Sequence, residues 1–434
     1  MKSSKGAVWY AMAVLFAVNA LNFFDRNILG AVGEPIRKEF DLSDASLGGL
    51  GTAFILLYAV IGIPLGRLAD RSSRKFILST GVFLWSVLTA ASGIAQNFGQ
   101  MFALRLGVGV GEASCAPASA SLIGDLFQAD KRGRAVSIFM LGLPVGIALS
   151  FAISGTIAKS YDWRLAFLLA GIPGVLLALA ALFIQEPLRG ARDAVQPVKF
   201  LHSPYRKVLA SPTMRWIIAS GILHNFCMYS VSGFLTPFLM RYHGLDIQKA
   251  GFAAMVINGI ITLPGLFLGG VIGDAARKRR PNGALIVVTA ACFLAAPFYY
   301  FSLGVSTGDV YPFVLLMGSA VALVYFYYPI VYSTIQNITP PELRGTAMSV
   351  YFLIMYLLGG ALGPYVVGTI SDYFTRQAAI AAGVVDPSAT ALESFKAEGL
   401  HSAMYVIPVL WVLLAVILLM AARTIVKESE PSRN

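Results

Sequence analysis

The chain has little charge and few cysteines for its length of 434 residues. Charged residues make up 13% of it and hydrophobic residues 57%, a balance that excludes a water-soluble globular protein. The three cysteines, Cys115, Cys227 and Cys292, show no disulfide or metal-ligand spacing and lie inside apolar runs, so we expect them to pack as small apolar side chains. The sequence also lacks a metal motif, a phosphate-binding loop and a nucleophile arrangement, which argues against an enzyme. We therefore expect an integral membrane protein without a metal or an organic cofactor.

Twelve apolar runs are long enough to cross a bilayer, which takes about 20 mostly apolar residues per helix. None of them alternates between apolar and polar residues as a membrane β-strand does. The runs begin near Val8, Ser46, Phe76, Gln100, Ala135, Leu165, Met214, Gln248, Ala284, Tyr311, Thr346 and Ser402. The sequence thus predicts an all-α membrane protein with twelve transmembrane helices.

Lysine and arginine collect on one side of these predicted spans. Of the 33 such residues, 23 lie in the termini and in the connections that follow even-numbered spans. Because cytoplasmic loops carry an excess of positive charge, we expect both termini in the cytoplasm. The net charge of +11 then reports topology and not nucleic-acid binding. No cleavable signal peptide or targeting extension is apparent, so the first span is expected to be the insertion signal and a bacterial inner membrane fits best.

A polar, basic stretch with several prolines divides the spans into two sets of six, as expected of a cytoplasmic linker. The predicted organisation is an N-terminal six-helix bundle over residues 1–184, the linker over 185–213 and a C-terminal six-helix bundle over 214–434.

The two halves also repeat each other. The segment Gly-Arg-Leu-Ala-Asp70-Arg-Ser-Ser-Arg-Lys after span 2 is echoed after span 8 by Gly-Val-Ile-Gly-Asp274-Ala-Ala-Arg-Lys-Arg. Before span 5, Arg132-Gly-Arg-Ala-Val-Ser is echoed before span 11 by Arg344-Gly-Thr-Ala-Met-Ser. Two echoes at matching positions indicate duplicated six-span units that are pseudo-symmetric.

The motif Gly62-Ile-Pro-Leu-Gly-Arg-Leu-Ala-Asp70-Arg71-Ser-Ser-Arg74-Lys between spans 2 and 3 resembles that of the major facilitator superfamily. The resemblance implies the major facilitator fold. It also implies that Asp70, Arg71 and Arg74 form a gate latch at the cytoplasmic end, with Asp274, Arg132 and Arg344 as repeat-related gating residues. The alternative is a solvated basic loop, which any cytoplasmic connection would resemble.

Four further segments are similar to the Spinster lipid transporters of that superfamily. They are Asn22-Phe-Phe-Asp25-Arg26, Arg105-Leu-Gly-Val-Gly-Val-Gly-Glu112-Ala-Ser, Leu122-Ile-Gly-Asp-Leu-Phe and Gln185-Glu-Pro-Leu-Arg-Gly-Ala. The similarity covers most of the N-terminal half and is weaker in the C-terminal half. It implies that spans 1, 4, 7 and 10 line a central cavity.

Four charged residues lie where hydrocarbon would surround them, two acids and two arginines in spans 1 and 4. An ionisable group near the bilayer midplane costs at least roughly 2.5 kcal/mol, so it is retained chiefly where it has a function. Arg105 and Glu112 are seven residues apart and share a helix face, as do Asn22 and Arg26, with Asp25 beside them. We expect Asp25 and Glu112 to accept protons, and Arg26, Arg105 and Asn22 to bind an anionic headgroup. Static ion pairs between the two spans are the alternative.

The C-terminal half offers a neutral, aromatic surface in its corresponding spans. We expect substrate contacts from Asn225 and Tyr229 in span 7 and from Tyr325, Tyr328 and Tyr332 in span 10, although aromatic side chains often only pack. His224 is either a proton relay or a hydrogen-bonded structural histidine.

Proline and glycine interrupt span 5 at Gly142-Leu-Pro-Val-Gly and span 11 at Gly359-Gly-Ala-Leu-Gly-Pro. These segments predict helices that bend or pack closely at corresponding places in the two halves.

The Spinster resemblance implies a proton-driven, alternating-access transporter of an anionic or zwitterionic amphiphile such as a lysophospholipid or a sphingoid phosphate. We expect a monomer in the lipid bilayer with the proton as coupling ion. One alternative is a proton-coupled symporter of small organic anions such as sugar acids, which polar walls in both halves would favour. A second is a non-transporting sensor or scaffold.

Overall fold

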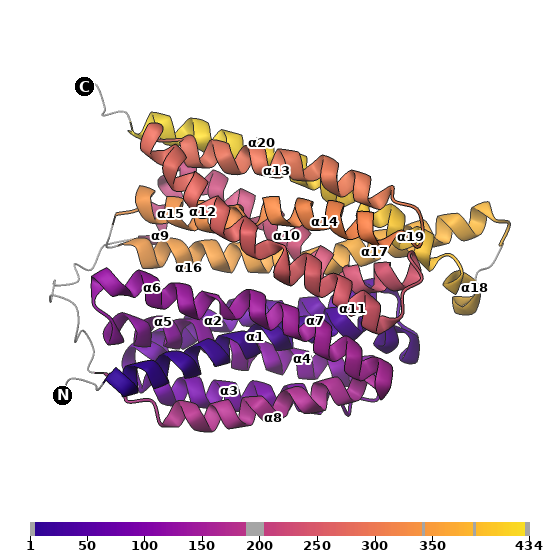
Figure 1. Ribbon diagram of the computed structural model, residues 1–434, viewed down its shortest axis with the longest axis horizontal. Helices are drawn as coiled ribbons and strands as arrows, with labels where there is room; N and C mark the ends of the chain where they lie inside the picture. The colour runs from indigo at the N-terminus through magenta and orange to yellow at the C-terminus, as the bar shows by residue number, and fades with distance from the viewer. Residues whose placement is uncertain (1–4, 188–203, 341–342, 385–387, 430–434) are drawn as a thin grey trace. The chain divides into compact units, whose positions relative to one another are not determined.

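The computed structural model describes residues 5–187, 204–340, 343–384 and 388–429, and within these ranges the regular structure is helical (Figure 1). The helices form two compact units. Unit 1 comprises Met1–Leu42, Gly49–Pro197 and Asp246–Met255, and unit 2 comprises Ser43–Gly48, Val198–Leu245 and Val256–Asn434. Each unit therefore includes a short segment from the other half of the sequence. Of the predicted linker, residues 188–203 lie outside the described ranges.

Nine α-helices build most of unit 1. They are α1 (Lys5–Glu39), α2 (Asp44–Arg71), α3 (Arg74–Ser92), α4 (Phe98–Glu112), α5 (Cys115–Leu126), α6 (Ala129–Met140), α7 (Gly142–Ser160), α8 (Trp163–Leu182) and α11 (Ile247–Met255). The described helices of unit 2 are α9 (Pro204–Ala210), α10 (Pro212–Arg241), the π-helix η1 (Val256–Ile260), α12 (Thr262–Arg279), α13 (Gly283–Leu303), α14 (Val310–Val324), α15 (Tyr327–Ile338), α16 (Arg344–Ile354), the π-helix η3 (Met355–Gly360), α17 (Leu362–Ala381), α18 (Ala389–Glu393), α19 (Lys396–Met404) and α20 (Val406–Ser429).

Eleven helical stretches within the described ranges are long and apolar enough to cross a membrane. They coincide with eleven of the twelve predicted runs. The fourth run, predicted to begin near Gln100, is also helical, but it is divided between α4 and α5. The all-α membrane architecture is therefore confirmed.

Proline accounts for the break in the fourth run and for similar breaks elsewhere. A proline has no N–H to donate to the carbonyl four residues earlier, so the helix loosens one turn before it. Pro117 follows the α4–α5 break, Pro144 the α6–α7 break, and Pro329 the break between α14 and α15. Pro364 follows η3, where Ala361 donates instead to the carbonyl of Tyr356, five residues back. The predicted interruptions of spans 5 and 11 are among these breaks.

Side-chain caps set the starts of three spans. The side chains of Asn97, Asp162 and Ser211 accept hydrogen bonds from the backbone N–H groups of Gln100, Arg164 and Met214. Such a cap satisfies one of the N–H groups that a first helical turn leaves without a partner. The helices α4, α8 and α10 therefore begin where the sequence supplies a polar residue ahead of an apolar run.

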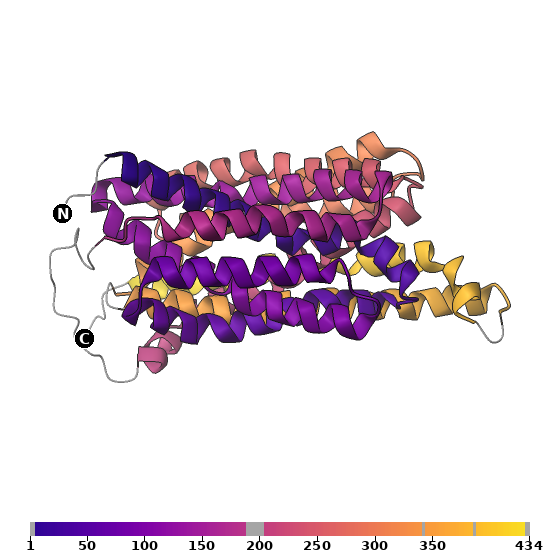
Figure 2. The same cartoon turned by 90° about the horizontal axis from the view of Figure 1, so that it is seen from below.

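Each unit buries its own aromatic core and leaves apolar side chains on its surface. In unit 1 α3 packs along α8, and in unit 2 α13 packs along α20 (Figures 1 and 2). Trp85 of α3 and Trp411 of α20 are fully buried. Large apolar residues such as Leu176 of α8 and Phe293 of α13 are exposed instead, by 62% and 57%. Helices that bury apolar side chains on one face and expose apolar side chains on the opposite face are expected where lipid covers the exposed face.

Candidate functional site: a buried charged cluster in unit 1

Helices α1 and α4 bring together three of the predicted site residues. Arg26 Nε donates to Oε2 of Glu112 at 2.8 Å, and Asn22 Nδ2 donates to the same oxygen at 2.9 Å. The side chain of Arg26 is 4% exposed and that of Glu112 is fully buried. A buried carboxylate needs hydrogen-bond donors, and Oε2 of Glu112 has a charged donor and a neutral one, whereas Oε1 has no partner among the described residues.

Helix α2 supplies aromatic rings to the same cluster. The guanidinium carbon of Arg26 lies 4.2 Å from the ring centroid of Tyr58 and 5.3 Å from that of Phe54. Rings at this distance attract a guanidinium through their negative faces. The sequence reasoning missed both residues. Their four-residue spacing in span 2, which places two aromatic side chains on one helix face, was the available signal.

Arg105 is the member of the cluster with two buried polar atoms that have no hydrogen-bond partner among the described residues. These atoms are Nε and Nη1. Arg105 is 1% exposed and lies 5.2 Å from the ring centroid of Phe54, measured from its guanidinium carbon. Of the two arginines, Arg26 forms an ion pair with Glu112, whereas Arg105 forms none with the described residues.

Asp25 is held separately, against α3. Its carboxylate is fully buried, and Oδ2 accepts a hydrogen bond from Oγ1 of Thr89 at 3.4 Å. The second oxygen, Oδ1, has no hydrogen-bond partner among the described residues. Unit 1 therefore contains two buried acids in different settings, one bound to an arginine and one bound weakly to a hydroxyl group.

A glycine lets α4 approach α2 at this point. A side-chain carbon added at Gly109 would lie 2.3 Å from the backbone oxygen of Phe54, so only glycine fits. Gly109 lies between Arg105 and Glu112 on the same face of α4. The glycine thus allows close approach of the two backbones, which brings Arg105 and Glu112 near α2.

The predicted aromatic residues of the C-terminal half form a cluster within unit 2. The rings of Tyr325, Tyr328 and Tyr332 follow one another at centroid distances of 5.3 and 5.8 Å. Tyr229 of α10 packs edge-on against Tyr356 of η3, at 6.2 Å. Asn225 is 2% exposed and donates to the backbone oxygen of Gly221 at 3.4 Å.

His224 lies against this aromatic cluster and is fully buried. Its ring stacks on Tyr327 with centroids 3.9 Å apart, and neither ring nitrogen has a hydrogen-bond partner among the described residues. The hydroxyl of Tyr327 instead shares hydrogen bonds with Ser220, at 2.8 Å, and with Tyr351, at 3.0 Å. The expectation of a hydrogen-bonded structural histidine is therefore not met within the described ranges. Tyr327 and Tyr351 were not singled out from the sequence.

Of the predicted gating residues, Arg74 makes the most contacts, all of them inside unit 1. It forms an ion pair with Asp125 at the end of α5 and donates Nε to Glu186 at 3.0 Å. Glu186 also accepts hydrogen bonds from the Arg74 backbone N–H and from the hydroxyl of Ser73. Burial raises the pKa of Glu186, but these hydrogen bonds outweigh it, so the net pKa lies below its usual range. Asp125 and Glu186 lie within two of the segments that resemble Spinster, although neither was assigned a role.

Arg132 and Arg344 make equivalent contacts in their two units. Arg132 donates Nη2 to the backbone oxygen of Gly124 at 2.6 Å, and Arg344 donates Nε to that of Gln336 at 2.8 Å. Each arginine thus binds a carbonyl eight residues earlier, near the end of the preceding helix, where a positive charge is favourable. Such identical contacts in both units accord with the internal repeat.

The remaining gating predictions receive less structural detail. Asp274 is exposed and lies 3.7 Å from Arg277 of its own helix. The side chains of Asp70 and Arg71 lie outside the described part of the chain.

Within the described ranges no three His, Cys, Asp or Glu side chains are grouped to hold a metal ion. The three cysteines are buried and unpaired with one another.

The chain can be compared with known proteins. Residues 15–364 match the family model described as Major Facilitator Superfamily. Protein spinster homolog 1 of Homo sapiens is 30% identical over 404 residues, which cover 86% of this chain and 75% of that protein. An MFS-type efflux pump of Mycolicibacterium smegmatis is 29% identical over 368 residues, covering 85% of each chain.

A solved structure is similar over almost the whole length. It is described as a bacterial homolog to the human lysosomal transporter Spinster, in an inward-facing and unoccupied conformation. Its TM-score is 0.87 at 28% identity, covering 99% of this chain and 100% of that one. A D-xylose-proton symporter, at 17% identity and a TM-score of 0.71, shares the fold alone. The chain is therefore an integral membrane transporter that belongs to the Major Facilitator Superfamily and, within it, to the Spinster-like proteins.

Proposed function

We propose that this transporter moves an anionic or zwitterionic amphiphile, of the lysophospholipid or sphingoid phosphate type, by alternating access coupled to protons. The observation that carries the proposal is the buried guanidinium of Arg105, whose Nε and Nη1 have no hydrogen-bond partner among the described residues. An unsatisfied buried donor costs about 1 to 3 kcal/mol, and more when it is charged. A carboxylate or phosphate group that reached Arg105 would supply the missing acceptors, and the planar guanidinium binds such groups at two points.

Glu112 and Asp25 are proposed as the proton acceptors. Glu112 shares Arg26 and Asn22 with any anion that enters the cluster, since both donors already bind its Oε2. If the headgroup takes Arg26, the carboxylate of Glu112 loses its charged partner and its protonated form is favoured. Anion binding and proton binding are thereby linked through one arginine. Asp25, with one oxygen unpartnered, is the second candidate.

The aromatic cluster of unit 2 supports an amphiphilic substrate. Tyr229, Tyr325, Tyr328 and Tyr332 present rings and few charges, and Asn225 adds one amide. We propose that these residues contact the less polar part of the substrate. The resemblance to the Spinster lipid transporters favours an amphiphilic lipid as the substrate.

We also propose that both termini are cytoplasmic and that residues 1–184 and 214–434 act as the two bundles around a linker. The proposed gating residues at the cytoplasmic end of a monomer are Asp70, Arg71, Arg74, Asp274, Arg132 and Arg344.

The test is uptake into proteoliposomes with and without a pH gradient. A labelled lysolipid and a labelled sugar acid are compared in the wild type, in Glu112→Gln and in Arg105→Gln. Glu398→Gln is the matched control, because Glu398 is an exposed acid of α19. We expect lysolipid flux that the gradient drives in the wild type and in the control. The flux should vanish with Glu112→Gln under a gradient and should fall in Arg105→Gln at any pH.

The other outcomes separate the alternatives. Flux of the sugar acid alone would make the chain a symporter of small organic anions. Gradient-driven lysolipid flux that persists in Glu112→Gln would remove Glu112 from the coupling step. No flux of either compound in folded protein would favour a sensor or scaffold.

A further inference from the structure

Two helix contacts show how the internal repeat aligns span 1 with span 7. A side-chain carbon added at Gly146 of α7 would lie 2.1 Å from the backbone oxygen of Ala20, and one added at Gly359 of η3 would lie 2.3 Å from that of Ile222. The glycines lie 213 positions apart in spans 5 and 11, and the two oxygens lie 202 positions apart. Each glycine thus meets the same place on the first span of its own half.

The same two offsets recur one turn further along these helices. Ser150 donates its hydroxyl to the backbone oxygen of Phe24 at 2.7 Å, and a side-chain carbon added at Gly363 would lie 2.4 Å from the backbone oxygen of Phe226. Ser150 and Gly363 are again 213 positions apart, and Phe24 and Phe226 are 202 positions apart. Residues of span 1 therefore have their counterparts in span 7 at an offset of 202 positions.

The charged cluster of unit 1 has an uncharged copy in unit 2. Span 4 corresponds to span 10 at an offset of 212 positions, as the equivalent contacts of Arg132 and Arg344 show. The counterparts of Asp25, Arg26, Arg105 and Glu112 are Cys227, Met228, Met317 and Val324, all of them buried. The fifth member of the cluster, Asn22, corresponds to a polar residue, His224.

His224 lacks the partner that its counterpart has. In unit 1 Asn22 donates to Glu112 at 2.9 Å, whereas the counterpart of Glu112 is Val324, whose side chain has no polar atom. His224 is fully buried, and neither of its ring nitrogens has a hydrogen-bond partner among the described residues. Buried polar groups are usually paired, because leaving one without a partner is unfavourable. The histidine thus holds two hydrogen-bonding atoms in reserve.

The neighbouring side chains fix the imidazole ring without binding its nitrogens. Tyr327 stacks on it at a centroid distance of 3.9 Å and an interplanar angle of 9°, and Tyr328 meets it edge-on at 4.9 Å. The Tyr327 hydroxyl is engaged with Ser220 and Tyr351. Tyr328 is partly exposed, so the cluster is not sealed on that side. A ring held in this way loses little freedom when a ligand binds it.

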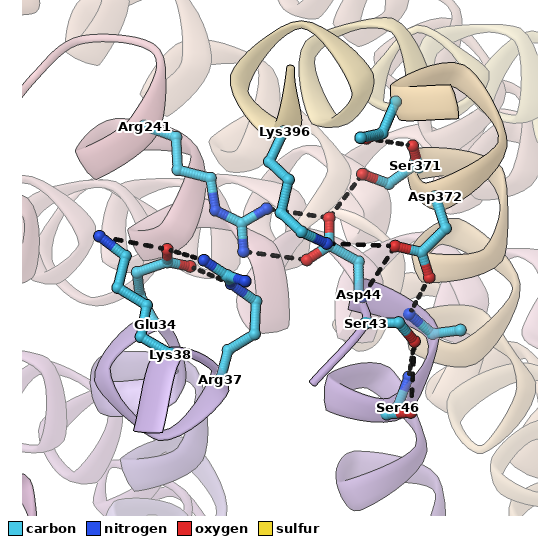
Figure 3. A network of polar contacts seen from close by, with 12 residues as sticks. Glu34, Arg37, Lys38, Ser43, Asp44, Ser46, Arg241, Ser371, Asp372 and Lys396 are labelled. Atoms are coloured by element: carbon cyan, nitrogen blue, oxygen red, sulfur yellow. Dashed lines mark hydrogen bonds and ion pairs between the residues drawn. The ribbon is translucent and has the colours of Figure 1, made fainter. Parts of the chain in front are cut away.

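The surroundings of His224 fit a neutral ligand group. The charged residues of α10 lie toward its ends, about 14 Å and about 26 Å from His224 along the helix. Arg215 is exposed, and Arg241 donates to both oxygens of Asp44 at 2.9 Å (Figure 3). Asp372 is also engaged there, since it accepts the backbone N–H of Asp44 at 3.0 Å. The helix α15 and the π-helix η3 contain no charged residue.

We propose that His224 determines specificity by hydrogen-bonding a hydroxyl group of the transported amphiphile. A neutral imidazole presents one donor and one acceptor, and a hydroxyl group can pair with either nitrogen. A carbonyl group could pair only with the donor, and an ammonium or phosphate group would lack a counter-ion on α10, α15 and η3 near the histidine. Lysophospholipids carry a free hydroxyl group that diacyl phospholipids lack. The proposal rests on the proposed class of substrate, and the contact itself involves unit 2 alone.

The experiment compares the binding of two lipids that differ only in this hydroxyl group. They are a radiolabelled acyl-glycerol phosphate and the acyl-propanediol phosphate with the same acyl chain. Equilibrium binding of each is measured by scintillation proximity on the purified full-length protein in detergent. His224→Phe removes both ring nitrogens and keeps a flat ring to stack on Tyr327. His224→Leu, which also lacks polar atoms, makes the same prediction if the phenylalanine variant does not fold.

The matched control is a second buried histidine of unit 2. His243 follows the end of α10, 19 positions after His224, and is 5% exposed. Both of its ring nitrogens also have no hydrogen-bond partner among the described residues. His243→Phe therefore makes the same chemical change at a different place in the unit.

We expect the wild type to bind the hydroxyl-bearing lipid about tenfold more tightly than its deoxy analogue, because the hydroxyl group supplies a partner to a buried polar atom. In His224→Phe the two affinities should agree within about twofold, through loss of affinity for the hydroxyl-bearing lipid alone. His243→Phe should keep the wild-type ratio.

Equal affinities in the wild type, or a wild-type ratio in folded His224→Phe, would overturn the role of His224. An equal loss of the ratio in His243→Phe would overturn it as well. Binding of both lipids without discrimination would keep the proposed class of substrate and reject this inference. Binding of neither lipid to the wild type would reject the class of substrate, and the inference with it.

Discussion

The ion pair between Arg26 and Glu112 gives the sharpest prediction for stability. Both side chains are buried, at 4% and 0% exposure, and their contact is 2.8 Å. Removing one partner of a buried pair typically costs about 3 to 5 kcal/mol, because the remaining charge has no water to replace it. In Glu112→Gln the amide oxygen still accepts from Asn22 or Arg26, so the loss is expected near the lower limit, about 3 kcal/mol.

A double-mutant cycle isolates the pair from its surroundings. Arg26→Gln removes the charge of the arginine. The double variant carries neither charge of the pair, so it buries no charge that has lost its partner. We expect the double variant to be less destabilised than the two single losses together, with a coupling energy of about 2 kcal/mol. The free energy of unfolding is measured in detergent by denaturant titration with tryptophan fluorescence. Glu398→Gln, as an exposed control, should change it by less than about 0.5 kcal/mol. A loss below about 1 kcal/mol in Glu112→Gln, or a coupling energy near zero, would refute the reasoning.

Two further predictions concern the same unit. Gly109→Ala should lower the melting temperature, with a loss of about 1 to 3 kcal/mol, because the new side-chain carbon would lie 2.3 Å from the Phe54 backbone oxygen. Gly62→Ala, which meets nothing within 4 Å, should be neutral or stabilising, and an equal loss in both variants would contradict the prediction. Because the pKa of Glu186 is lowered in the folded state, its contribution to stability is present above the pKa of the unfolded chain. It is lost as the pH falls through the folded-state pKa. Melting temperatures between pH 6 and pH 3 should therefore fall more steeply in the wild type than in Glu186→Gln, and parallel curves would show that Glu186 does not contribute.

Hydropathy was sufficient to locate the spans because lipid imposes the same length and apolarity on each of them. The runs predicted to begin near Met214 and Ala284 correspond to helices that begin at Pro212 and Gly283. The fourth run was harder to describe, because its division depends on local chemistry within an apolar segment. The Ser114 hydroxyl binds the Gly111 carbonyl at 2.8 Å, and Pro117 has no N–H to offer Ala113.

The charged cluster was only partly predictable. The spacing placed Asn22 and Arg26 on one face of span 1 and Arg105 and Glu112 on one face of span 4, and the structure shows Asn22 and Arg26 hydrogen-bonded to Glu112. Spacing within one helix does not determine which partner a side chain finds on another. The side chain of Arg105, which was expected to bind an anionic headgroup, lies against the ring of Phe54, a contact that spacing within span 4 did not indicate.

Contacts between segments that are far apart in the chain could not be predicted from the sequence. The cap that Asp372 provides for α2 joins residues 328 positions apart. No local pattern around Asp44 distinguishes it from any other acid at the start of a helix. Only the tertiary arrangement shows that it is buried and bound to Arg241.

The central claim is that one buried cluster links anion binding to proton binding. The most direct measurement is the pH inside proteoliposomes carrying a pH-sensitive dye, followed after a lysolipid is added outside, with no ion gradient present at the start. We predict a proton flux that accompanies lipid movement in the wild type and is absent in Glu112→Gln. Lipid movement without any proton flux in the wild type, or an equal proton flux in Glu112→Gln, would contradict the account.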